Sequence, residues 1–165
     1  MQSKKLTRGL LCFYLLMLTW IIVFKMAFSP GMLARILTVN LIPFGASVIV
    51  NGHISFSEII QNALAFIPLG IFIHALWEEK PLINRILPII FTSLLFEMAQ
   101  FIFAIGASDI TDLISNSLGG IAGIGIATAL SKFLPKHWRK LVNAGCLIGA
   151  LVLSALVILL LVVNI

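Results

Sequence analysis

The chain has 165 residues, of which 61% are hydrophobic and only 10% are charged, and its formal net charge is +5. Soluble domains carry about 25% charged residues. This composition, with a mean hydropathy of +1.15, therefore excludes a soluble globular protein and indicates an integral membrane protein with no nucleic-acid partner.

Five apolar stretches are long enough to cross the hydrocarbon core of a bilayer, which takes about 20 residues of helix. Basic residues precede the first stretch, as in a secretory signal, but the "KMAFSPG" after it lacks a small-residue cleavage site, which favours an uncleaved span. We therefore predict an all-α fold, with one polytopic domain over residues 1–165 and a compact bundle of about five transmembrane helices with one larger outer loop. The predicted spans are residues 10–28, 59–77, 86–105, 110–134 and 141–163.

Lys and Arg are distributed unevenly between the two sides that these spans define. Only Lys25 and Arg35 fall on the side of the larger loop. Because basic loops stay in the cytoplasm, we expect a cytoplasmic N-terminus and an extracytoplasmic C-terminus. On the inner side, Glu78 and Glu79 are expected to form a solvated face. The inner basic residues are Lys4, Lys5, Arg8, Lys80, Arg85, Lys132, Lys136, Arg139 and Lys140.

The outer loop, residues 29–57, carries two local patterns. Four apolar residues recur at helical spacing beside Arg35, which predicts a short helix in the membrane interface. Further on, "VIVNGHISF" predicts a tight turn at residues 51–52 between two short strands. Arg35 is the main outer candidate for binding an anionic group, or else a snorkelling interface residue. The four apolar residues are Met32, Leu33, Ile36 and Leu37.

Glu97 is the most informative polar residue, because it lies inside the third span and away from any helix end. A charge at mid-membrane costs about 2.5–3.5 kcal/mol. Ser93 and Gln100 lie on the same helix face, at i−4 and i+3. We expect this stripe to face the bundle interior, where it serves either interhelical hydrogen bonding or a functional site.

Asp109, Asp112 and Asn116 mark the outer start of the fourth span. Asp109 is a good N-cap and Asp112 suits the first turn of a helix, so a structural interpretation stands beside a functional one. Small residues then permit a close helix approach. This seam is expected to bring Asp112 and Asn116 against Glu97 and Gln100 in an outward-facing polar pocket. The small residues are Gly119, Gly120 and Gly123.

The second span adds polar groups from the same outer side. Glu58 and Asn62 lie one turn apart at its start, and Pro68 and Gly70 follow. Pro68 lacks a backbone N–H and predicts a kink. Asn62 is expected either to join the pocket or to hydrogen-bond between helices.

Other chemistry is poorly represented. Cys12 and Cys146 lie in apolar runs and are expected to be small apolar fillers. His74 and the other histidines are isolated and have no zinc-ligand spacing, and no Ser-His-Asp set is evident. We expect no metal and no cofactor. G-x3-G pairs in the fourth and fifth spans fit dimer contact or internal packing equally well, so the oligomeric state stays open.

Four stretches, "NLIPF", "NALAFIPLG", "SLLFEMAQ" and "DITDLISNSLGGIAG", resemble, in order, the motifs of the VanZ-like membrane proteins. The resemblance implies a bacterial plasma-membrane protein, and the founding type of the family gives low-level resistance to teicoplanin, a lipid-tailed glycopeptide antibiotic. Many relatives carry an Arg between the last two motifs, where this chain has "FIFAIGAS". The motif positions carried over are Asn40, Pro43, Asn62, Pro68, Glu97, Gln100, Asp109, Asp112, Asn116 and Gly119.

Three functions are compatible with these features. The first is a non-enzymatic protein whose outer pocket engages a lipid-tailed molecule, either a lipid-linked cell-wall precursor or a lipoglycopeptide, and lowers glycopeptide susceptibility. The second is a membrane-embedded enzyme that acts on an envelope lipid through paired carboxylates. The third and weakest is a proton-linked transporter, because no inverted repeat is evident. Membrane lipids are expected partners in each case.

Overall fold

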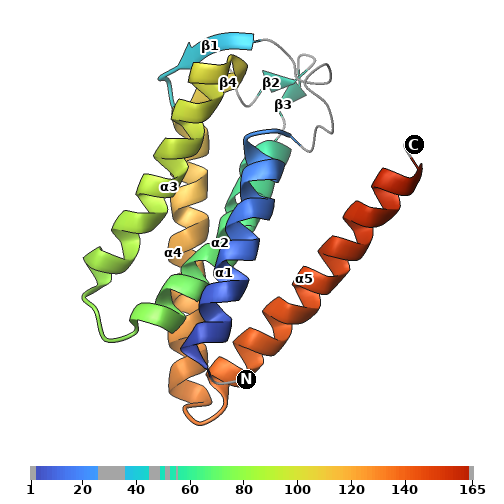
Figure 1. Cartoon of the computed structure of the whole chain (residues 1–165). Coiled ribbons are helices and arrows are strands. Elements are labelled where there is room, and N and C mark those ends of the chain that lie inside the picture. Colours follow the sequence, from blue (N-terminus) through green and yellow to red (C-terminus); the bar gives the residue numbers. More distant parts are fainter. Residues whose placement is uncertain (1–2, 26–35, 45–48, 51–52, 55, 164–165) are drawn as a thin grey trace.

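The chain folds into a bundle of long helices capped by short strands (Figure 1). Every helix is long and apolar enough to cross a membrane, so the predicted all-α, multi-pass fold is confirmed. The helices are α1 (Lys4–Ile22), α2 (Ser57–Trp77), α3 (Leu82–Phe103), α4 (Ile110–Phe133) and α5 (Trp138–Val163). This computed structural model describes residues 3–25, 36–44, 49–50, 53–54 and 56–163.

The predicted span ends differ from the helix ends mainly at polar turns. Helix α1 begins at Lys4 and ends at Ile22 rather than spanning residues 10–28. Ser3 starts it, because the Ser3 hydroxyl accepts a hydrogen bond from the Lys5 backbone N–H at 3.2 Å. Hydropathy does not detect a polar first turn as part of a span. For this reason α3 and α5 also begin earlier than predicted.

Helices α2 and α4 form the closest pair in the bundle. A methyl group on Gly119 would overlap the Ala63 carbonyl, and one on Gly123 would overlap the Ile67 carbonyl. Gly70 on α2 meets the Gly120 carbonyl in the same way. The small residues of α4 therefore serve packing inside the bundle, and α2 is a continuous helix with Pro68 inside it.

Helix α5 leans away from the other helices toward the C-terminus (Figure 1). Only its start is firmly packed, where Trp138 and Val142 are buried against Ala75 of α2. Further along, Gly145 and Gly149 have open space beside them. They line an apolar groove of about 250 Å³ between α5, α1 and α2.

The outer loop contains strands where a helix was predicted. Strand β1 (Ile36–Asn40) pairs in parallel with β4 (Ile105–Asp109), so that Asn40 lies opposite Asp109. The predicted interfacial helix is therefore wrong at Ile36 and Leu37, because a short apolar run fits a strand as well as a helix. Met32 and Leu33 lie outside the described residues.

The predicted pair of short strands farther along the loop is confirmed. Strands β2 (Ile49–Val50) and β3 (His53–Ile54) are antiparallel. The turn residues 51–52 lie outside the described residues.

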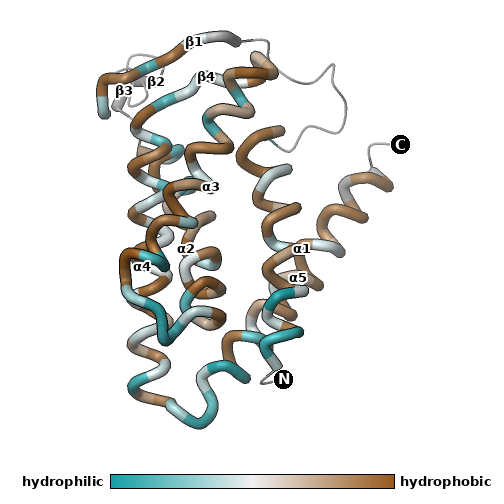
Figure 2. The backbone as a smooth tube through the Cα atoms, turned by 60° about the vertical axis from the view of Figure 1, so that its left-hand side comes forward, coloured by the Kyte–Doolittle hydropathy of each residue, from teal (hydrophilic) through white to brown (hydrophobic). Residues whose placement is uncertain are grey.

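The bundle has two chemically different ends. The acidic end is where α1 and α3 end and α2 and α4 begin, and it carries Glu58, Asp109 and Asp112. At the basic end, hydrophilic positions gather around the α2–α3 and α4–α5 turns (Figure 2). The basic end carries the N-terminus and Lys4, Lys80, Arg85, Lys136 and Arg139.

Candidate functional site

A polar stripe on α3 faces the bundle interior, as the sequence predicted. Ser93, Glu97 and Gln100 are 0%, 8% and 3% exposed. The Glu97 carboxylate Oε2 accepts a hydrogen bond from the Asp109 backbone N–H at 2.9 Å. Gln100 Nε2 donates to the Ile22 carbonyl at 3.0 Å. The stripe thus joins α3 to the start of α4 and to the end of α1.

Asp109 holds the start of α4 in place. Its Oδ1 accepts the Thr111 backbone N–H at 2.8 Å, which is an N-cap, and its Oδ2 accepts Asn40 Nδ2 at 2.9 Å. The Phe44 backbone N–H donates to Thr111 Oγ1 at 3.0 Å. Asp109 is therefore the N-cap of α4. The "NLIPF" segment is hydrogen-bonded to this cap, with its Pro43 exposed.

Asn116 lies one turn deeper in α4 than Asp112. Its Nδ2 donates to Ser93 Oγ at 3.0 Å, and both side chains are fully buried. The expected contact of Asn116 with the α3 stripe is therefore present, but it is made to Ser93, one helical turn before Glu97.

A cavity of about 190 Å³ lies beside this layer at the acidic end. Asp112 points to it from α4 and is hydrogen-bonded to the side chain of Asn62 on α2. Lys25 Nζ lies 3.5 Å from Glu58 Oε1, in a half-exposed pair, a kind of pair that contributes little stability. The residues lining the cavity are Ile21, Ile22, Lys25, Glu58, Gln61, Asn62, Ala65, Gln100 and Asp112.

The structure thus divides the predicted site residues into two groups. Four of them line the cavity, namely Glu58, Asn62, Gln100 and Asp112. Three form the buried layer behind it, namely Glu97, Asp109 and Asn116. Arg35 lies outside the described residues. Gln61 was not predicted, although Glu58-x2-Gln61 repeats the spacing of the E-x2-Q motif on α3.

The buried layer and the adjoining Gln100 are rich in hydrogen-bond acceptors. Glu97 Oε1, Gln100 Oε1 and Asn116 Oδ1 are buried and have no hydrogen-bond partner among the described residues. The Gln100 amide is oriented by the Ile22 carbonyl, which can only accept. An unsatisfied buried acceptor costs about 1–3 kcal/mol. This end of the bundle is therefore complementary to groups that donate hydrogen bonds.

Metal chemistry has no evident ligand set in the described part of the chain. No group of three or more His, Cys, Asp or Glu side chains there is placed to hold a metal ion. The polar lining of the cavity instead combines two acids and Lys25 with three amides. Recognition of a polar donor group is the chemistry that this arrangement supports.

Comparison with known proteins identifies the family. The family model described as VanZ/LLP1 matches residues 11–132. The chain belongs to the VanZ/LLP1 family. The Enterococcus faecium "Protein VanZ" is 35% identical to it over 159 residues, covering 95% of this chain and 94% of that protein. No solved structure matches the chain. The matched region of this VanZ/LLP1 protein contains the whole cavity lining and ends before α5.

Proposed function

We propose that this VanZ/LLP1 protein lowers susceptibility to lipid-tailed glycopeptides such as teicoplanin by engaging a lipid-tailed or lipid-linked molecule at the acidic end. Family membership supports the link to teicoplanin resistance. The observation that carries the proposal is the cavity in which Glu58, Asn62 and Asp112 meet Gln100. These side chains come from α2, α3 and α4, so only the folded bundle assembles the cavity.

The location of the cavity suits a molecule with a polar head and an apolar tail. It lies where the spans end, so a head group in it would leave the tail at the depth of the apolar helices. Its carboxylates and amides would accept hydrogen bonds from amine, hydroxyl or amide groups of the ligand. The positive-inside distribution of Lys and Arg supports placing this end on the outer side of a bacterial plasma membrane.

Drug susceptibility tests this proposal. The parent chain and the Glu97→Gln/Asp112→Asn double variant are each expressed, at matched protein level, in a glycopeptide-susceptible Gram-positive host. The inhibitory concentrations of teicoplanin and vancomycin are then measured for both strains. Both substitutions keep the side-chain shape, and the amide that replaces the Glu97 carboxylate retains an acceptor for the Asp109 N–H. The control is Glu79→Gln, which makes the same kind of change at an exposed position beyond α2.

We expect protection against teicoplanin, with little against vancomycin, in the strains carrying the parent chain and Glu79→Gln. The double variant should lose the protection. Full protection by the double variant would rule out the acidic-end cavity as the functional site.

A lipid-modifying enzyme is a second candidate, favoured by the presence of Glu58 and Asp112 in one cavity. Two carboxylates in different surroundings can serve as acid and base, and Asp112 is the more buried of the two. Incubating the purified protein with extracted envelope lipids and following their masses tests this candidate. Lipids that stay unchanged, with and without Mg²⁺, would exclude it.

A further inference from the structure

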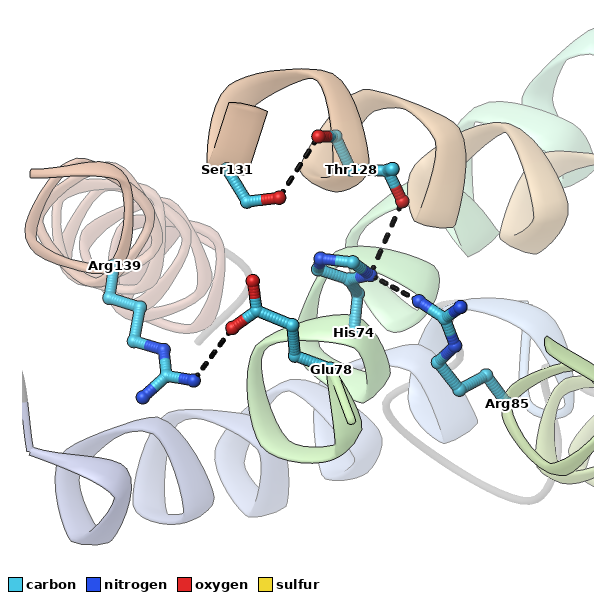
Figure 3. Close-up of polar contacts among 6 residues, drawn as sticks. All are labelled: His74, Glu78, Arg85, Thr128, Ser131 and Arg139. Carbon is cyan, nitrogen blue, oxygen red and sulfur yellow. Dashed lines mark hydrogen bonds and ion pairs between the residues drawn. The ribbon is translucent and has the colours of Figure 1, made fainter. Parts of the chain in front are cut away.

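A second polar cluster lies at the basic end, far along the helices from the candidate site. His74 is 2% exposed, and its Nδ1 lies 2.6 Å from Arg85 Nη1 and 3.3 Å from Thr128 Oγ1 (Figure 3). A guanidinium group is always charged and only donates, so Nδ1 accepts and the ring proton sits on Nε2. The sequence suggested that His74 is isolated, but it is not, because the α2–α3 turn brings Arg85 back beside it.

Glu78 and Arg139 form the other half of this cluster. Arg139 Nη2 lies 2.8 Å from Glu78 Oε2, and both side chains are partly exposed. Of the predicted solvated face, Glu79 is exposed, whereas Glu78 is only partly exposed and is paired with Arg139, because α5 begins directly beside it. Trp138 links the two halves: its ring centre lies 5.4 Å from that of His74, and the Arg139 guanidinium lies 5.2 Å from it.

Three buried donors in this cluster have no hydrogen-bond partner among the described residues. They are His74 Nε2, Arg85 Nε and Arg139 Nε. The side of the His74 ring that carries Nε2 faces Glu78 and Ser131 (Figure 3). Among the described residues, the acidic end leaves only acceptors unsatisfied and the basic end leaves only donors. A group complementary to these donors is therefore a hydrogen-bond acceptor.

A cavity of about 430 Å³ opens beside Arg139 and Trp138, at the α5 side of this cluster. The Glu78–Arg139 pair also lines a second cavity, of about 140 Å³. Lys4 and Lys80 also line the smaller cavity. The larger cavity is lined by Glu78, Ser131, Pro135, Lys136, Trp138 and Arg139. Four cationic side chains thus face two acids, Glu78 and Glu79, across the two cavities.

We propose that the larger cavity binds the phosphate of an anionic phospholipid headgroup through Lys136 and Arg139. The Ser131 hydroxyl, which donates to the Thr128 carbonyl at 2.9 Å, would turn to the phosphate as a third donor. The cavity lies where α4 ends and α5 begins, so it is at headgroup depth if these helices span the bilayer. Trp77, which is exposed, lies at the same end, as tryptophans do at membrane interfaces. Basic pockets between spans at this depth recognise lipid headgroups, and the bilayer supplies such an anion at high local concentration.

Native mass spectrometry of the full chain tests the proposal. The protein is purified in detergent and supplied with equal amounts of phosphatidylglycerol and phosphatidylcholine. The test variant is Lys136→Gln/Ser131→Ala, and the control is Lys140→Gln, which removes the same charge from an exposed residue outside the cavity. Lys136→Arg keeps the charge. We expect a preference for phosphatidylglycerol that falls about tenfold in the test variant and persists in both Lys140→Gln and Lys136→Arg.

Two results would overturn the proposal. One is an equal loss of phosphatidylglycerol in Lys136→Gln/Ser131→Ala and Lys140→Gln, which would indicate general charge attraction rather than a site. The other comes from thermal unfolding of the protein in phosphatidylcholine nanodiscs. If inorganic phosphate raised the unfolding temperature as much as phosphatidylglycerol does, a free anion would be the ligand. Stabilisation by phosphatidylglycerol alone is the expected result.

Discussion

At the residue scale, two acids of one motif have different surroundings. Asp109 is 7% exposed and uses both carboxylate oxygens within the protein, on Thr111 and Asn40. Asp112, three residues later, lines the cavity. Sequence spacing alone did not predict which acid caps the helix and which lines the cavity, because both residues suit the first turn of a helix. The β1–β4 pair distinguishes the two acids, because it places Asn40 opposite Asp109.

Asp109→Ala should lower the free energy of unfolding by about 2 kcal/mol, since it removes an N-cap and leaves Asn40 without its partner. Asp109→Ser should lower the free energy of unfolding by about half as much, because the serine hydroxyl caps a helix well but is too short to reach Asn40. Thermal or denaturant unfolding in detergent measures both values. Equal losses in the two variants would show that the cap contributes nothing.

The burial of Glu97 was predictable, but its partner was not. A carboxylate in mid-span must face the protein interior. Its partner, however, is the backbone N–H of Asp109. This contact exists because Ala104, with φ of 52°, ends α3 in the left-handed conformation and β4 returns the chain beside the helix. Nothing local in the sequence specifies that reversal.

At the element scale, the α2–α4 seam positions the site. Glycines bring α4 against the backbone of α2, and this approach sets Asp112 beside Asn62. The glycine pattern predicted close packing, and the structure assigns it to the interior of the bundle. Parallel pairing of β1 with β4 was beyond prediction, because the two strands are short and distant in sequence.

Gly119→Ala and Gly123→Ala should each destabilise the bundle by about 1–3 kcal/mol, because the added methyl overlaps a carbonyl of α2. Gly125→Ala is the matched control on the same helix. It has open space around it and should be neutral or stabilising by up to about 1 kcal/mol. Unfolding of purified variants in detergent distinguishes these outcomes. A Gly119→Ala variant as stable as Gly125→Ala would contradict the close seam.

At the scale of the whole molecule, the termini lie at opposite ends of the bundle (Figure 1). The proposed orientation places the basic end in the cytoplasm. It predicts that a C-terminal alkaline phosphatase fusion is active and that a C-terminal green fluorescent protein fusion is dark. Fusions that end in the α2–α3 turn, after Lys80, should behave in the opposite way. A fluorescent C-terminal fusion would show that the orientation is the opposite one, with the acidic end inside the cell.

The central claim is that the acidic-end cavity engages a lipid-tailed molecule, and direct binding tests it. Purified protein in nanodiscs is titrated with teicoplanin and, separately, with vancomycin, using the parent chain, Asp112→Asn and the Glu79→Gln control. The account predicts selective teicoplanin binding by the parent and the control, weakened about tenfold or more in Asp112→Asn, since a hydrogen bond to a charged group contributes about 1.5–3 kcal/mol. Teicoplanin binding that is absent from the parent, or equally strong in all three proteins, would contradict it.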